Sequence, residues 1–128
     1  AAAGADWVTL TNTISGAAID VEGRRPVLSS GAGGYSGPPL KPIALRCVME
    51  VASRLPGLPI VGCGGVVTGR DVVEYLMAGA TAVGLGTVHF AEPRAAARIL
   101  GELVSWCRRH GVTSVADLIG SAILEEDR

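Results

Sequence analysis

Two short apolar segments, each ending in small, glycine-rich residues, lie one helix apart along this chain. They are residues 60–65 (IVGCGG) and residues 82–87 (AVGLGT). A short, continuously apolar segment is typical of a strand buried on both faces, as in parallel sheets whose strands are joined by helices. Because parallel strands end at the same edge of a sheet, the two glycine-rich ends are predicted to lie side by side.

Neighbouring glycine-rich strand ends of this kind can form a cradle for a phosphate group. Glycine has no Cβ, so backbone N–H groups there can approach an anion closely. Barrels of the (β/α)8 type commonly bind a phosphate after strands 7 and 8. We therefore predict a phosphate site at the two strand ends, with a phosphorylated cofactor as its occupant.

Strands and amphipathic helices alternate along most of the chain. Residues 7–11 are predicted to be a buried strand that ends at Asn12 and Thr13, and apolar residues recur at helical spacing over residues 42–55. The intervening residues 14–39 have little helical periodicity and many Gly, Pro and Ser residues, so we expect a long loop. A loop of this length inside a compact domain is usually functional.

Further helices are predicted on either side of the second glycine-rich segment. Thr68 is a suitable N-cap with Asp71 as a capping-box-like partner, and Gly79 is expected to end that helix. Another helix is expected over residues 93–110, and a short final helix is expected to begin with Ser114 and Asp117. Strands that alternate with helices in this way require parallel pairing and right-handed crossovers.

This order predicts an α/β fold, namely the C-terminal part of a (β/α)8 TIM barrel. A complete barrel needs roughly 250 residues, so residues 1–128 would supply about three βα units of its second half. The opening residues 1–6 resemble the helix-to-strand boundary at residues 78–81, so we expect a fragment that begins at the tail of a helix. A small open doubly wound sheet, with phosphate at its switch point, is the alternative.

Composition argues against several functional classes. The net charge of −1, from 11 basic and 12 acidic residues, offers no basic face for nucleic acid. No apolar segment approaches the ~18 residues that a membrane span needs. The three cysteines are odd in number and lack metal-ligand spacing, so we expect reduced thiols in a cytoplasmic protein and no metal site.

Asn12 and Thr13 are candidates for substrate contact, because barrel enzymes place working side chains at the carboxyl ends of strands. The planar amide of Asn matches the polar edge of an amide, imide or pyrimidine. An Asn that only hydrogen-bonds its own loop explains the pattern equally well. Residues 31–39 are rich in glycine and precede a helix, so their N–H groups could also approach an anion.

Three reactive side chains near these segments have ordinary structural explanations. Lys41 could contact a phosphate or a flavin, but a solvated lysine is the commoner case. Cys63 is interpreted as a small core residue and not a nucleophile, and His89 as a structural histidine that could line the phosphate loop. The residues show no acid/base pair that could run a reaction unaided.

Several longer motifs carry a family resemblance. They are residues 9–48 (TLTNTISGAAIDVEGRRPVLSSGAGGYSGPPLKPIALRCV), residues 58–87 (LPIVGCGGVVTGRDVVEYLMAGATAVGLGT) and residues 111–120 (GVTSVADLIG). In order and spacing they resemble the C-terminal half of the dihydroorotate dehydrogenases, and the Asn-Thr and GGYSGP motifs are most similar to the class 1 enzymes, particularly the type 1B catalytic subunit. Related flavoproteins such as dihydropyrimidine dehydrogenase share part of the pattern.

The resemblance implies that residues 1–128 are the C-terminal half of a flavin-binding TIM-barrel dehydrogenase domain. Such enzymes oxidise dihydroorotate to orotate in pyrimidine (UMP) biosynthesis. The resemblance also implies a homodimer, or a heterotetramer with a subunit that carries FAD and an iron–sulfur cluster and passes electrons to NAD. The cofactor FMN is expected at Thr11, Gly37, Gly64, Gly65, Gly86 and Thr87, and the substrate at Asn12 and Thr13.

The catalytic base of class 1 enzymes is a cysteine in the first half of the barrel. None of the three cysteines here occupies that motif, so no catalytic residue is assigned and the chain alone is expected to be inactive. Two alternatives stay open. One is another FMN-dependent barrel that acts on a pyrimidine-like compound, and the other is a non-catalytic half barrel that binds phosphate or serves in assembly.

Overall fold

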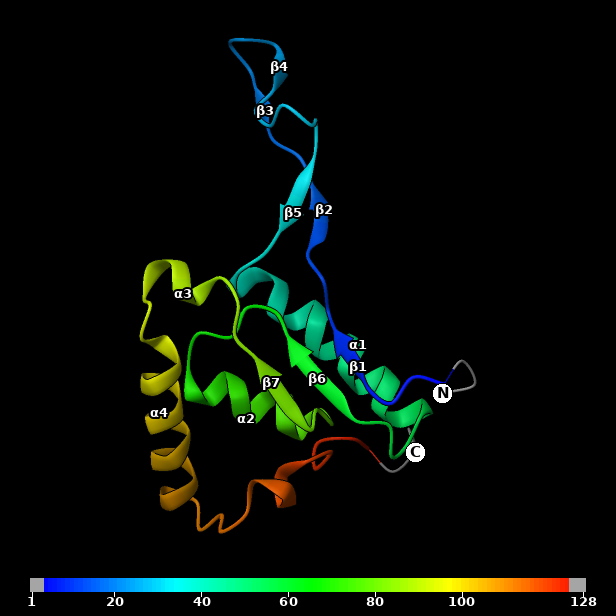
Figure 1. Ribbon diagram of the computed structural model, residues 1–128, viewed down its shortest axis with the longest axis vertical. Helices are drawn as coiled ribbons and strands as arrows, with labels where there is room; N and C mark the ends of the chain where they lie inside the picture. Colours follow the sequence, from blue (N-terminus) through cyan, green and yellow to red (C-terminus); the bar gives the residue numbers. More distant parts are fainter. Residues whose placement is uncertain (1–3, 125–128) are drawn as a thin grey trace.

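Three parallel strands form the centre of the computed structural model, which describes residues 4–124 (Figure 1). They are β1 (Val8–Leu10), β6 (Ile60–Cys63) and β7 (Ala82–Gly84), in that order across the sheet. The two glycine-rich ends therefore lie at the carboxyl ends of neighbouring parallel strands, as predicted. The strand order follows the chain order, so these strands contain no topological switch point, which the doubly wound alternative needs.

Helices α1 (Lys41–Arg54) and α2 (Gly69–Met77) cover one face of this sheet (Figure 1). A core of fully buried side chains joins them to it, with Val48 from α1, Ile60 from β6 and Tyr75 from α2. In β6, Ile60 and Gly62 face this core, and the alternate residues are only half-buried. A Cβ on Gly62 would collide with the ring of Tyr75, so glycine allows α2 to pack closely on the strand.

The predicted capping of α2 is confirmed. The Thr68 hydroxyl accepts a hydrogen bond from the Asp71 N–H at 3.2 Å, and the Asp71 carboxylate accepts one from the Thr68 N–H at 2.8 Å. The helix ends at Met77, and Gly79 follows with a φ of +109°. Since glycine adopts this backbone conformation without strain, the predicted helix end is confirmed too.

The C-terminal region differs in detail from the expectation. The predicted third helix begins at Ala95 and not Pro93, as α4 (Ala95–Arg109), and a short unexpected helix, α3 (Val88–Ala91), precedes it. A four-residue helix is too short to show helical periodicity in a sequence. The final helix is of the 3-10 type, η2 (Val115–Leu118), and Leu118 packs against α2.

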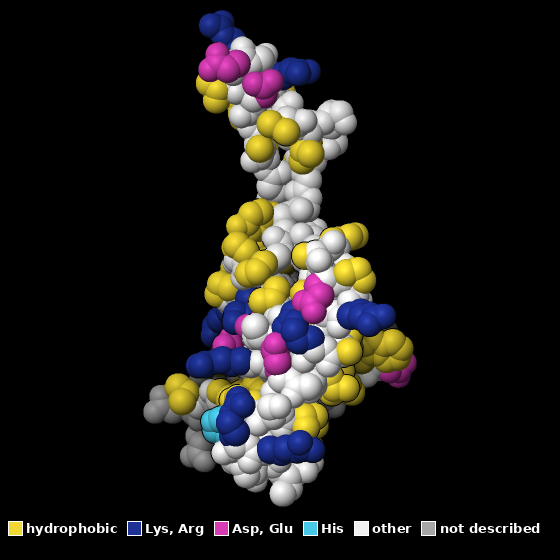
Figure 2. All heavy atoms as spheres, turned by 90° about the vertical axis from the view of Figure 1, so that its left-hand side faces the viewer, with side chains coloured by type: hydrophobic (Ala, Val, Ile, Leu, Met, Phe, Trp, Pro, Cys, Tyr) yellow, Lys and Arg dark blue, Asp and Glu magenta, His cyan; other side chains and the backbone are white. Residues whose placement is uncertain are grey.

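The segment expected to be a long loop is largely an antiparallel β arm that projects from the sheet (Figure 1). Strand β2 (Ile14–Gly16) pairs with β5 (Gly33–Tyr35), and β3 (Ile19–Asp20) with β4 (Arg25–Pro26), before the 3-10 helix η1 (Pro38–Leu40). Strands of two or three residues are too short to show alternation. Figure 2 shows apolar side chains along the arm and charged ones at its tip.

Two further expectations concern the start of the chain and membrane-spanning segments. Residues 1–3, half of the predicted helix tail, lie outside the described residues. Over the described residues, none of the helices has the length and apolar character that crossing a membrane requires.

Replacing Gly101 with alanine is expected to stabilise the chain by about 1 kcal/mol, because Gly101 is an exposed position inside α4. A Cβ there would meet no atom within 4 Å. Urea denaturation measures the change. Gly69→Ala is the matched control, and it should destabilise the chain since its Cβ would collide with the backbone of Leu103. Equal effects of the two substitutions would contradict this interpretation.

Candidate functional site

One cavity of about 160 Å³ lies at the carboxyl ends of the three parallel strands. Pockets that hold a whole small ligand usually measure at least ~300 Å³. This cavity is therefore large enough for a phosphate-sized part of a ligand and too small for a complete nucleotide. All eight residues that the sequence predicted for the site line it, namely Thr11, Asn12, Thr13, Gly37, Gly64, Gly65, Gly86 and Thr87.

Two glycines after β6 shape the inner wall of the cavity. Gly64 has a φ of +134° and Gly65 a φ of +69°, both in the region that favours glycine. A Cβ on Gly65 would lie 2.7 Å from the Gly37 carbonyl oxygen and 3.0 Å from the backbone nitrogen of Lys41. The wall can therefore adopt this shape only with glycine at position 65.

Several polar groups at this site have no partner in the protein. None of the hydrogen bonds among residues 4–124 uses the backbone N–H groups of Gly65, Gly86 or Thr87. The Thr11 hydroxyl oxygen is buried and has no partner within the same residues. Since buried polar groups are almost always hydrogen-bonded, this arrangement fits a ligand with several acceptor oxygens, such as a phosphate ester.

Tyr75 supports the glycine wall from behind, which the sequence did not indicate. Its side chain is fully buried, and its hydroxyl donates a hydrogen bond of 2.7 Å to the Gly64 carbonyl oxygen. Burial raises the pKa of this hydroxyl, so it stays protonated and remains a donor. With its carbonyl held toward the core, the peptide after Gly64 has a defined orientation.

The Tyr75→Phe substitution is expected to lower the free energy of unfolding by about 1–2 kcal/mol, because it leaves the Gly64 carbonyl without a donor. Denaturation in urea tests this, with Tyr35→Phe on the exposed arm as the control. Equal losses from the two substitutions would show that the buried hydroxyl does not hold the wall.

Lys41 is not the solvated lysine that the sequence suggested. Its ammonium group forms ion pairs with Asp71 and, at 2.8 Å, with Glu74, both on α2. Burial lowers the pKa of Lys41, but its two carboxylate partners outweigh this and raise the pKa above its usual value. The lysine therefore joins α1 to α2, and its charge is already neutralised within the protein.

The N-terminus of α2 is also already occupied by side chains. The Asp71 carboxylate accepts hydrogen bonds from the N–H groups of Val67 and Thr68, and Glu102 of α4 accepts one from Gly69 at 2.7 Å. An anion cannot use these donors without displacing a carboxylate. The N–H groups of Gly65, Gly86 and Thr87 meet no such competition from carboxylates among residues 4–124.

Asn12 uses only part of its amide within the protein. Its carbonyl oxygen accepts a hydrogen bond of 2.8 Å from the N–H of Thr13. Asn12 therefore does hydrogen-bond its own loop, which was one of the two interpretations of this residue. Across the described residues, the Asn12 amide nitrogen donates to no protein acceptor. The side chains of Asn12 and Thr13 are exposed at the cavity, so they remain available to a ligand there.

Cys63 and His89 show no arrangement typical of a catalytic pair. Cys63 is half-buried and lines the cavity as a free thiol, and His89 lies on α3 away from the lining. Within residues 4–124, no group of three or more His, Cys, Asp or Glu side chains is placed to hold a metal ion. Four lining residues are not among the eight predicted ones, namely Ser36, Leu40, Cys63 and Val66, and of these only Leu40 does not adjoin a predicted residue. Cys63 is therefore not the core residue that the sequence suggested.

Known proteins with similar sequences include dihydroorotate dehydrogenases. A family model described as dihydroorotate dehydrogenase matches residues 1–106. The chain is 47% identical over 124 residues to the protein named dihydroorotate dehydrogenase B (NAD(+)), catalytic subunit, of Porphyromonas gingivalis, covering 97% of this chain and 40% of that one. It is 50% identical over 119 residues to the protein of the same name from Citrifermentans bemidjiense, covering 93% and 39%.

Solved structures agree with the sequence matches. The crystal structure of a ligand-free dihydroorotate dehydrogenase from Eimeria tenella superimposes with a TM-score of 0.75 at 32% identity, covering 92% of this chain and 33% of that one. The chain thus spans about 40% of the length of the bacterial relatives. On the family match and these similarities, the chain belongs to the dihydroorotate dehydrogenase family.

Proposed function

We propose that this chain forms the phosphate-binding and substrate-contacting part of an FMN-dependent dihydroorotate dehydrogenase. The complete enzyme oxidises dihydroorotate to orotate in pyrimidine (UMP) biosynthesis, and residues 1–128 are the C-terminal half of its (β/α)8 barrel. The observation that carries the proposal is the convergence of eight residues, from three strand ends and one loop, on a single cavity of phosphate size.

Each group at the cavity has a role in this proposal. The N–H groups of Gly64–Gly65 and Gly86–Thr87 bind the phosphate of FMN, and their backbone shape excludes larger residues at position 65. Thr11 and Gly37 contact the rest of the cofactor, and the Thr11 hydroxyl gains the partner that the protein does not provide. Bound FMN supplies the redox chemistry, and the protein orients the substrate against it.

Asn12 and Thr13 contact the substrate ring. The Asn12 amide nitrogen and the Thr13 hydroxyl lie at the cavity, and both can hydrogen-bond the polar edge of orotate. Since the catalytic base lies outside residues 1–128, this chain binds and positions the reactants and does not itself abstract a proton.

The proposed partner is a separate electron-transfer subunit. The names of the bacterial relatives describe a catalytic subunit and NAD(+). For the complete protein we propose a homodimer, or a heterotetramer with a subunit that carries FAD and an iron–sulfur cluster, working in the cytoplasm.

A full-length chimera tests the proposal, with this chain in place of the matching segment of the Porphyromonas gingivalis catalytic subunit. We expect a yellow protein that binds FMN and forms orotate from dihydroorotate with a dye acceptor. The chimera with Asn12→Ala should lose most of this activity and retain FMN. A yellow chimera that oxidises other dihydropyrimidines and not dihydroorotate would support a different flavoenzyme. Failure to bind FMN would leave a half barrel with a role in assembly.

A further inference from the structure

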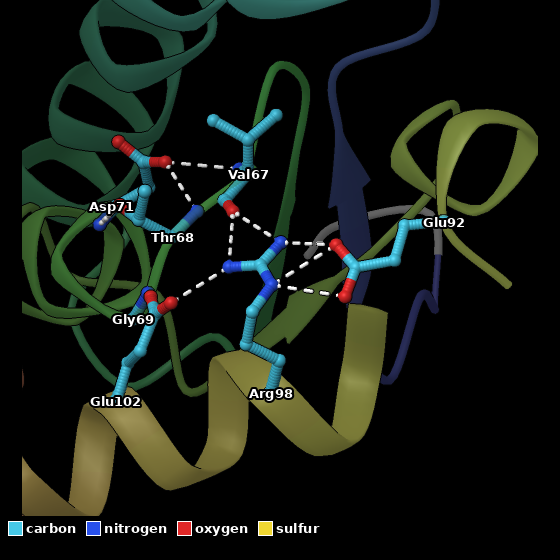
Figure 3. Close-up of polar contacts among 7 residues, drawn as sticks. All are labelled: Val67, Thr68, Gly69, Asp71, Glu92, Arg98 and Glu102. Atoms are coloured by element: carbon cyan, nitrogen blue, oxygen red, sulfur yellow. Dashed lines mark hydrogen bonds and ion pairs between the residues drawn. The ribbon is translucent and has the colours of Figure 1, made fainter. Parts of the chain in front are cut away.

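A single arginine connects the two backbone loops that meet at the cavity. Arg98 lies on α4, and its guanidinium group contacts the loop after β6 on one side and the segment after β7 on the other (Figure 3). It lies 31 residues from its partner in the first loop. No motif in the sequence analysis included Arg98.

Toward the first loop, Arg98 binds the backbone itself. Both terminal nitrogens of the guanidinium donate to the Val67 carbonyl oxygen at 3.2 Å (Figure 3). Val67 directly follows Val66, the last lining residue of this loop. The Val67 N–H donates to the Asp71 carboxylate at 2.9 Å, so the peptide groups on both sides of Val67 are held.

Toward the second segment, Arg98 binds the carboxylate of Glu92. Its Nε donates to both carboxylate oxygens, at 3.0 and 2.9 Å, and one terminal nitrogen donates to Oε2 at 2.7 Å. Glu92 follows α3, and its own N–H donates to the Val88 carbonyl oxygen at 2.9 Å. Within α3, the N–H of His89 donates back to the carbonyl oxygen of Gly86. The segment from Gly86 to Glu92 is therefore one hydrogen-bonded unit.

Glu102 completes the arrangement on α4. It accepts a hydrogen bond of 2.7 Å from Arg98 through one oxygen and one of 2.7 Å from the Gly69 N–H through the other. This contact keeps the guanidinium in the plane that reaches both Val67 and Glu92 (Figure 3). Arginine is suited to this role because its planar group offers five donors in a rigid geometry.

We propose that Arg98 is a positioning residue for the cofactor phosphate, which sets the separation between the two glycine-rich ends. This inference rests on the proposed function. Arg98 itself does not line the cavity, so it acts through the backbone of the two loops. We call the contacts of Arg98 with Val67, Glu92 and Glu102 the brace. Backbone donors must be held close to their working geometry to bind an anion well, so loss of the brace weakens phosphate binding without removing any ligand contact.

Arg98 is expected to affect phosphate binding through the geometry of the two loops and not through its charge. The positive charge of Arg98 is balanced by the carboxylates of Glu92 and Glu102. These side chains are also 38–41% exposed, and exposed ion pairs contribute little to stability. The brace is therefore expected to affect phosphate binding more than folding.

The test compares FMN with riboflavin, which lacks the phosphate, in the full-length chimera described above. Arg98→Gln is expected to raise the FMN dissociation constant about tenfold, the lower end of the loss caused by removing groups that orient metal ligands, and to leave the riboflavin dissociation constant unchanged. Glu92→Gln is the second variant. It removes a negative charge near the site, so a pure field effect would tighten FMN binding, and the brace predicts weaker binding.

Arg54→Gln is the matched control, because Arg54 forms an exposed ion pair with Glu50 on α1, remote from both loops. It should change neither dissociation constant, and thermal unfolding should show all variants folded. Unchanged FMN binding in Arg98→Gln, or tighter binding in Glu92→Gln, would overturn the inference. A parent chimera that does not prefer FMN to riboflavin would instead contradict the proposed function.

Discussion

The Gly65→Ala chimera is expected to bind FMN at least about 100-fold more weakly than its parent, because donors displaced by even 1 Å lose most of their effect. Position 65 has a φ of +69°, and a Cβ there would lie 2.7 Å from the Gly37 carbonyl oxygen. The wall must move to relieve this contact. Titration of the apoprotein with FMN, followed by flavin fluorescence, measures the loss.

Stability separates a local effect of this substitution from general damage. The strained backbone at position 65 is expected to lower the free energy of unfolding by about 2 kcal/mol. Gly86→Ala is the matched control, since Gly86 lines the same cavity and a Cβ there would meet no protein atom within 4 Å. It should weaken FMN binding by crowding the ligand and leave stability unchanged. Normal FMN affinity in both variants would contradict the cradle.

The Asp71→Ala substitution is expected to lower the free energy of unfolding of the chain by about 3 kcal/mol, because it removes one carboxylate from three partners. Asp71 is 6% exposed, and it accepts hydrogen bonds from the Lys41 ammonium and from the N–H groups of Val67 and Thr68. Urea denaturation at pH 7 measures the loss. Glu50→Ala, which breaks only an exposed ion pair, should change stability little, and an equal loss there would refute the argument.

The same carboxylate predicts how stability depends on pH. Burial raises the pKa of Asp71, but Lys41 and the two N–H donors together hold the pKa below its usual 3.8. A folded-state pKa below the unfolded value stabilises the protein above the unfolded value, and this contribution is lost as the pH falls through the folded pKa. The difference in unfolding free energy between the parent and Asp71→Asn should therefore be constant above about pH 5 and shrink below it. A difference that grows as the pH falls would mean that folding raises the pKa of Asp71, and it would contradict this prediction.

The arm shows where sequence analysis was wrong about the fold. Each of its strands has only two or three residues, and pairing such as Ile14 with Tyr35 joins positions on opposite sides of a turn. Alternation cannot be detected over so few residues, and the glycines, prolines and serines are typical of a loop. Only the paired backbone shows that the segment is a ribbon.

Most of the candidate site was predictable because most of its residues directly follow short apolar segments in the sequence. Glycines that end an apolar segment, and Asn12 and Thr13 directly after another, mark the carboxyl ends of strands without reference to the rest of the chain. Once the strands are parallel, their ends meet at one edge, so Asn12 and Thr13 and the two glycine-rich ends line one cavity. Gly37 reaches it from a loop, and Thr11 was expected there only through the family resemblance.

The supports of the cavity depended on three-dimensional packing. Lys41 meets Asp71 across 30 residues, and Arg98 meets Val67 across 31, so neither pair has a spacing that a periodic pattern could show. Local residue order therefore specified the three parallel strands, their ends and the longer helices, because hydrophobic period and glycine content act over a few residues. The neutralised lysine, the tyrosine behind the wall and the arginine between the loops were decided only when helices α1, α2 and α4 packed together.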